Sequence, residues 1–169
     1  MKHKFFIAIL PLVTSIITSC SKDKPLDTSS NNVSATISTG NNAPFQFSVT
    51  GAAVHIYPSI SSPSTYNLDA TDANNNHLFF AVEYVTQTGT YPFTSNNGIG
   101  SGLSFIKNLG SISQVTYLTS DTSITNKGSV TITALNDHHI EGLFTAFCKN
   151  DNNTGEAAQV SNGSFKGNF

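Results

Sequence analysis

One stretch of oxygen-bearing side chains has the spacing of a calcium-binding loop. Asp72, Asn74 and Asn76 stand at alternate positions and Glu83 follows them at the distance of the last ligand of such a loop. Carboxylate and amide oxygens are the ligands that Ca²⁺ prefers. However, His77 stands where a glycine makes the sharp turn, and the apolar run after it is typical of a buried strand. These two departures favour an Asn-rich hairpin turn over a metal site.

Other residues that could do chemistry do not form a recognisable set. His138 and His139 are adjacent, so a strand places them on opposite faces, and no His-x-His or Cys-x-x-Cys spacing indicates zinc. Ser101 lies between glycines but lacks the strand–turn–helix context of a nucleophile elbow. Cys148 falls on the apolar side of an alternating run, which predicts a core residue rather than a reactive thiol. We therefore expect no enzyme active site and no cofactor.

The N-terminal segment has the charge and hydropathy order of a secretory signal. Lys2 and Lys4 form a basic start, and residues 5–17 are mostly apolar. The apolar stretch is shorter than the roughly 20 residues that a membrane-spanning helix needs. The segment is therefore expected to direct export rather than to cross the bilayer in the finished protein.

The tetrapeptide Ile-Thr-Ser-Cys at residues 17–20 resembles the lipobox of bacterial lipoproteins. In that family the signal is removed before the cysteine, and the cysteine thiol carries a diacylglycerol. The resemblance implies a signal peptide over residues 1–19 and a lipidated Cys20 that begins a flexible linker over residues 20–32. Two or three acyl chains hold a protein at a membrane essentially permanently. Ser21 after the cysteine implies the outer membrane, on a periplasmic or cell-surface face that the sequence does not define.

The composition is that of a polar and nearly neutral protein. Charged residues make up 11% of the chain and the net charge is −2, whereas an average soluble protein has about 25% charged residues. Since no basic cluster could neutralise phosphates, we expect no nucleic-acid partner. Tryptophan is absent and the 12 phenylalanines outnumber the 5 tyrosines. This ratio favours a phenylalanine-filled core over a surface that stacks on sugars.

Residues 33–169 consist of short runs in which apolar and polar side chains alternate, as in β-strands. The clearest runs are residues 33–38, 45–50, 53–57, 129–134 and 140–148. Residues 78–85 are apolar on both faces apart from Glu83, as in a covered strand. Turns rich in Asn and Gly separate the runs, and no window keeps helical periodicity. We predict a single all-β domain, an antiparallel β-sandwich of roughly ten short strands, with an up-and-down or partly open β-barrel as the alternative.

Four sequence elements resemble a family of small lipoproteins. They are Gly-Thr-Tyr-Pro-Phe at 89–93, Gly-Ser-Val-Thr-Ile-Thr at 128–133, Ile-Glu-Gly-Leu-Phe at 140–144 and Val-Ser-Asn-Gly-Ser-Phe at 160–165. In small Bacteroidota lipoproteins of unknown function, similar glycines and core aromatics recur behind a lipobox. The chain is similar in this way to the group known as domain of unknown function 6252. The resemblance implies a β fold and a location in the cell envelope, and it carries across no catalytic residues.

These observations predict a lipid-anchored envelope domain that binds or scaffolds at the outer membrane without enzymatic activity. The membrane is its partner through the lipid on Cys20, and the sequence does not define a protein or glycan partner. The alternative is a carrier of a small molecule or carbohydrate, with a lipocalin-like cavity of several hundred Å3. For a carbohydrate, we expect a coplanar pair of exposed rings from the set Tyr57, Tyr66, Tyr84, Tyr91 and Tyr117.

Overall fold

The computed structural model describes residues 27–62, 64–95, 100–152 and 155–169, and nearly all of its regular structure is β-strand. The strands are β1 (Asn32–Thr39), β2 (Phe45–Thr50), β3 (Val54–Pro58), β4 (Tyr66–Thr71), β5 (His77–Val82), β6 (Gly89–Pro92), β7 (Gly102–Lys107), β8 (Val115–Leu118), β9 (Gly128–Asn136), β10 (His139–Asn150) and β11 (Ala157–Asn168). The helical structure in these ranges is one 3-10 turn, η1 (Gly51–Ala53). The prediction of an all-β fold is confirmed.

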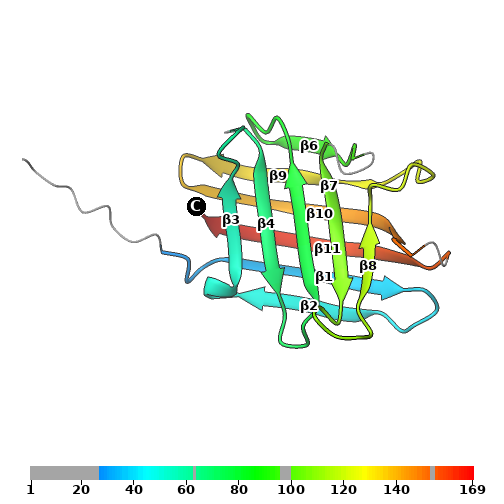
Figure 1. Cartoon of the computed structure of the whole chain (residues 1–169). Helices are drawn as coiled ribbons and strands as arrows, with labels where there is room; N and C mark the ends of the chain where they lie inside the picture. The colour runs from blue at the N-terminus through cyan, green and yellow to red at the C-terminus, as the bar shows by residue number, and fades with distance from the viewer. Residues whose placement is uncertain (1–26, 63, 96–99, 153–154) are drawn as a thin grey trace, which may run out of the picture.

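The eleven strands form one antiparallel sheet that curls into a nearly closed barrel with an unsealed seam (Figure 1). Hydrogen-bonded neighbours follow the order β2-β1-β11-β10-β8-β7-β5-β4-β3, and β9 pairs with β10 and β6 beside this path. β2 and β3 end the order and therefore flank the seam. In Figure 1 the wall of β3, β4, β5, β7 and β8 runs across the wall that contains β1, β2, β10 and β11.

One short pairing corrects the preference for a sandwich of two separate sheets. β10 pairs with β9 as far as Ala146, and its last residues, Lys149 and Asn150, pair instead with Leu118 and Tyr117 of β8. This exchange of partner joins the two walls into one hydrogen-bonded sheet. The arrangement corresponds to the partly open barrel that the sequence left as the alternative.

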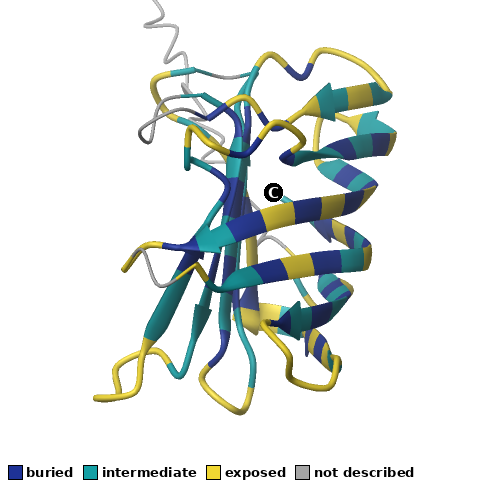
Figure 2. Cartoon of the chain, turned by 90° about the vertical axis from the view of Figure 1, so that its right-hand side faces the viewer, coloured by how far each residue is buried: buried dark blue, intermediate teal, exposed yellow. Residues whose placement is uncertain are grey.

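The alternation that predicted the strands also predicts which side chains are buried. Along β10, every second residue from Ile140 to Cys148 is buried, and Figure 2 shows the resulting bands along the outer strands. The run predicted over residues 78–85 is shorter in the structure, because Tyr84 has a φ of 61° that no strand accommodates. Glu83 therefore lies just outside β5 rather than within a buried strand.

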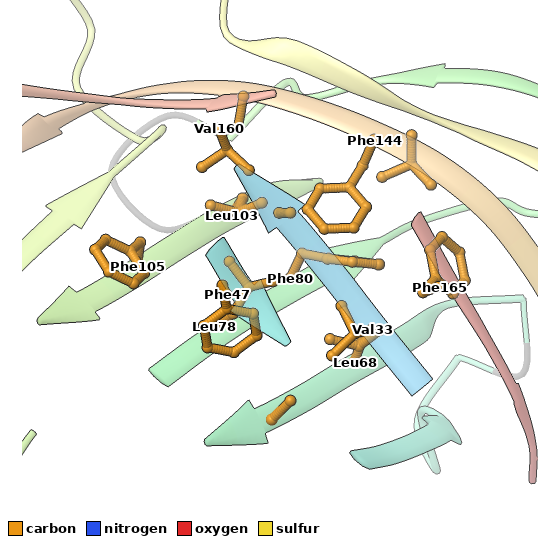
Figure 3. Packing of buried hydrophobic residues seen from close by; sticks show 14 of the residues in the cluster. Val33, Phe47, Leu68, Leu78, Phe80, Leu103, Phe105, Phe144, Val160 and Phe165 are labelled. Atoms are coloured by element: carbon orange, nitrogen blue, oxygen red, sulfur yellow. The ribbon is translucent and has the colours of Figure 1, made fainter. Parts of the chain in front are cut away.

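Phenylalanine rings fill the space between the two walls (Figure 3). The ring centroid of Phe80 lies 5.3 Å from that of Phe144 and 5.2 Å from that of Phe165. Each fully buried large apolar side chain contributes about 1.5–3 kcal/mol to stability. Cys148 is fully buried in the same core, as its alternation predicted, and burial raises the pKa of its thiol to about 12. The thiol therefore stays protonated and is not a nucleophile.

Asn31 joins the chain ends beside the seam and is itself 1% exposed. Its Nδ2 donates to the carbonyls of Val54 (3.2 Å) and Asn168 (3.4 Å), and its Oδ1 accepts from the backbone N–H of Asn168 (2.8 Å). A Cβ on Gly167 would lie 2.8 Å from that Oδ1, so the contact requires glycine there. Asn31 is therefore a buried, hydrogen-bonded part of the folded structure although it precedes β1.

Replacing Asn31 by alanine should lower the free energy of unfolding by about 2–4 kcal/mol, because the Val54 carbonyl and the Asn168 N–H lose their buried partner. Chemical denaturation of the purified protein measures this loss. The control is Asn32→Ala, whose side chain makes no hydrogen bond within the described residues and which should cost less than about 0.5 kcal/mol. Equal losses in the two variants would show that the Asn31 amide does not hold the seam.

Candidate functional site

The structure separates the residues of the calcium-like pattern. Oδ1 of Asp72 accepts from the backbone N–H groups of Asn74 (2.8 Å) and Asn76 (2.8 Å), and Oδ2 accepts from the Asn76 side chain (2.9 Å). Asn75 adopts a φ of 58°, as the tip of a tight turn requires. Glu83 follows the far end of the six-residue strand β5, which spans about 20 Å. The pattern forms a hairpin turn, as its departures from a calcium loop indicated.

The remaining titratable side chains are dispersed over the sheet. Nε2 of His77 lies 3.0 Å from Oδ1 of Asp69 on the neighbouring strand β4, and His55 points outward from β3. Within the described ranges, no three His, Cys, Asp or Glu side chains lie close enough together to hold a metal ion. The same ranges contain no helix with the length and apolar character needed to span a bilayer.

A polar cluster lies on the outer surface where the chain enters the domain. Nε2 of His139 lies 2.8 Å from Oε1 of Glu141, and Nδ1 lies 2.7 Å from Oδ1 of Asn168. The bond to Glu141, followed by that to Asn168, raises the pKa of His139 above its ordinary value, because both acceptors favour the protonated ring. The amide of Asn168 also donates to the carbonyl of Asp27 (2.8 Å). The cluster therefore joins the two ends of the described chain.

The tyrosines do not form the expected coplanar pair. Tyr117 is buried, and the ring of Tyr66 packs edge-on against Phe169. Tyr91 donates its hydroxyl to the carbonyl of Gln87 (2.8 Å). No two tyrosine rings are in contact among the described residues. In the described part of the chain the tyrosines therefore offer a sugar only single exposed rings, Tyr57 and Tyr84, and no contacting pair.

Two large apolar side chains instead lie on the outer side of β10. Leu143 is 54% exposed and Phe147 is 38% exposed, and Thr145 lies between them on the same side. A groove of about 460 Å3 and another of about 630 Å3 adjoin on this face, and both are lined by Phe147 and Gln159. Exposed apolar groups that border a concave polar surface are typical of binding sites.

This outer surface was not identified as a site from the sequence, although a signal for it exists. The alternation that places Cys148 inside also places Phe147 outside. Phe147 and Leu143 together give this side of β10 two outward apolar side chains. Because most phenylalanines were assigned to the core, Phe147 was not distinguished from them.

No protein-family model, curated protein or solved structure matches the chain. What defines its class is therefore the fold, an antiparallel all-β sheet curled into a nearly closed barrel. The similarity to small Bacteroidota lipoproteins stays a prediction. The signal and Cys20 lie in residues 1–26, outside the described residues.

Replacing Asp72 by alanine removes the acceptor of three hydrogen bonds and should cost about 1–3 kcal/mol of stability. Millimolar calcium should leave the melting temperature of the wild-type protein unchanged, because the carboxylate is occupied by N–H donors and Glu83 is remote. Thermal unfolding with and without calcium measures both effects. Asn74→Ala, whose side chain makes no hydrogen bond with described residues, is the control. A rise in melting temperature with calcium would restore the metal site.

Replacing Glu141 by glutamine should lower the pKa of His139, because the larger of its two stabilising contacts loses its charge. In the wild type the folded pKa is raised, so the stabilisation is complete below the unfolded value of about 6.5 and is lost as the pH rises through the folded pKa. NMR titration of the His139 ring gives the midpoint directly. Asp137→Asn, an acid without contact to that ring, should leave the midpoint unchanged. A midpoint unaffected by Glu141→Gln would contradict the assignment.

Proposed function

We propose that the protein is a lipid-anchored domain of the bacterial outer membrane that binds a partner through the outer face of β10 and performs no catalysis. The lipobox at residues 17–20 supports lipidation of Cys20, and the resemblance to domain of unknown function 6252 supports an envelope location. The observation that carries the binding role is the outward side chain of Phe147, which lines both of the adjoining grooves.

The geometry of the chain ends supports presentation of this face away from the membrane. Asp27 and Asn31 are hydrogen-bonded to Asn168, which pairs with His139 at the start of β10 (Figure 1). Phe147 lies eight residues further along the same strand, a distance of about 25 Å. A lipid attached before Asp27 would therefore hold the domain by one corner and leave the grooves accessible.

The packed interior favours external binding over the carrier alternative. A carrier needs an open space between the walls, whereas the rings of Phe80, Phe144 and Phe165 contact one another there (Figure 3). The two grooves beside Phe147 lie on the outer surface. We therefore place the binding function on the outside of the barrel.

Replacing Cys20 by serine should move the full-length protein from the membrane fraction to the soluble fraction, because the acylated thiol is lost. Expression in a Gram-negative host, followed by fractionation and mass spectrometry, measures both the location and the added diacylglycerol mass. Cys148→Ala is the matched control and should stay with the membrane, since that thiol is buried in the core. If the wild type and Cys20→Ser both fractionate with the soluble pool, the lipid anchor is wrong.

A further inference from the structure

Three outward side chains stand in one row across β10, β11 and β1. Phe147 is directly opposite Gln159, and Gln159 is directly opposite Ser38 on its other side. Neighbouring strands lie about 4.8 Å apart, so an aromatic ring, an amide and a hydroxyl follow one another at that spacing. The pairing register, rather than a mobile loop, sets these positions.

Within the described residues, the side chains of Gln159 and Ser38 are not hydrogen-bonded to the protein. They differ in this from the corresponding side chains in the row that contains Leu143, four residues earlier on β10. There, Leu143 is opposite Ser164, and the hydroxyls of Ser164 and Ser34 lie 3.0 Å apart in a hydrogen bond. The side chains of Gln159 and Ser38 have no hydrogen-bond partner within the described part of the chain. An exposed amide offers two N–H donors and a carbonyl acceptor to a ligand.

The surface is hollowed on both sides of the Phe147 ring. The groove of about 460 Å3 extends toward Ser123 and Asn126, and the groove of about 630 Å3 extends toward Asn41 and Gly155. Because both grooves share Phe147 and Gln159, an elongated ligand that crosses the ring would lie in both. A compact ligand would use only one of them.

Among the described residues, the charged side chains that line the two grooves are one cation and one anion, so the surface has no net charge and favours an uncharged ligand. Nζ of Lys149 donates to the hydroxyl of Ser123, and the carboxylate of Glu156 is hydrogen-bonded to the buried hydroxyl of Tyr117. The other polar groups that line the grooves are amides and hydroxyls. The two grooves therefore offer a ligand mainly uncharged hydrogen-bonding groups.

We infer that the row of Phe147, Gln159 and Ser38 is a subsite for a neutral polysaccharide chain. A sugar ring presents a C–H face that stacks on an aromatic ring and a hydroxyl edge that pairs with amides, and this row offers both groups side by side. A chain of sugars also matches two adjoining grooves. This inference rests on the proposed binding face and names the class of its ligand.

Affinity electrophoresis of the full chain in mild detergent tests the subsite, with soluble starch, xylan, β-glucan or galactomannan in the gel and alginate as an anionic comparison. We expect at least one neutral polysaccharide to retard the wild type. Phe147→Ala and Phe147→Leu should weaken that binding by about tenfold or more, because neither provides an aromatic face. Phe147→Tyr should retain it, and Gln159→Ala should weaken it to a smaller extent.

Leu143→Ala is the matched control, since it truncates an exposed apolar residue of the same strand that borders a different groove of about 440 Å3. It should bind like the wild type, and circular dichroism should show every variant folded. The inference is overturned if no neutral polysaccharide retards the wild type, or if Leu143→Ala weakens binding as much as Phe147→Ala. Concentration-dependent self-association that Phe147→Ala abolishes would also overturn it, while leaving the outer face as the binding surface. The membrane fractionation of Cys20→Ser tests the lipid anchor separately.

Discussion

A sheet that curls without closing leaves backbone groups at its seam that still need hydrogen-bond partners, and here the buried side chain of Asn31 supplies partners for three of them. Asn31 bonds to β3 and to β11, which are not paired as strands, so its amide takes the place of a ladder at this corner. The glycine at position 167 gives that amide its space. At the other side, the short pairing of β10 with β8 joins the walls. Between these two links the walls are held face to face, and the phenylalanine core can form.

Because the core fills the barrel, each strand has one side that faces the core and one side that faces solvent. β10 is an example. Its inner side carries Phe144 and Cys148, and its outer side carries Leu143 and Phe147. The neighbouring strand β11 contains a bulge in its pairing with β10, and Asn162 adopts a φ of 49° in this bulge. A Cβ on the following residue, Gly163, would lie 2.5 Å from the Phe144 carbonyl, so the bulge also depends on glycine. The bulge shifts the side-chain alternation of β11 between the two outer rows.

The period-two pattern predicted the strands and the burial of Cys148 well, because alternation directly reports which side of a sheet faces the core. It could not predict barrel closure, since closure depends on an exchange of partner within the continuous strand β10. Asn31 looked like part of a polar linker, because its role comes from groups more than a hundred residues away. The calcium-like spacing at Asp72 was ambiguous for a related reason: the same oxygens bind a metal or cap backbone N–H groups, and only the turn geometry decides. The same alternation places Phe147 outside, but this residue was not identified as a site from the sequence.

Two regions of the domain lie on the same strand β10 but are too far apart to interact energetically. The His139 cluster and Asn31 lie at the corner where the chain enters, whereas Phe147 lies about 25 Å along β10. Because both regions lie on one paired strand, their separation within the domain is fixed. Interaction energies do not extend as far, because sites more than about 7–10 Å apart without shared partners contribute additively. Protonation of His139 therefore changes the stability of the corner where the two chain ends meet without altering the polar groups beside Phe147.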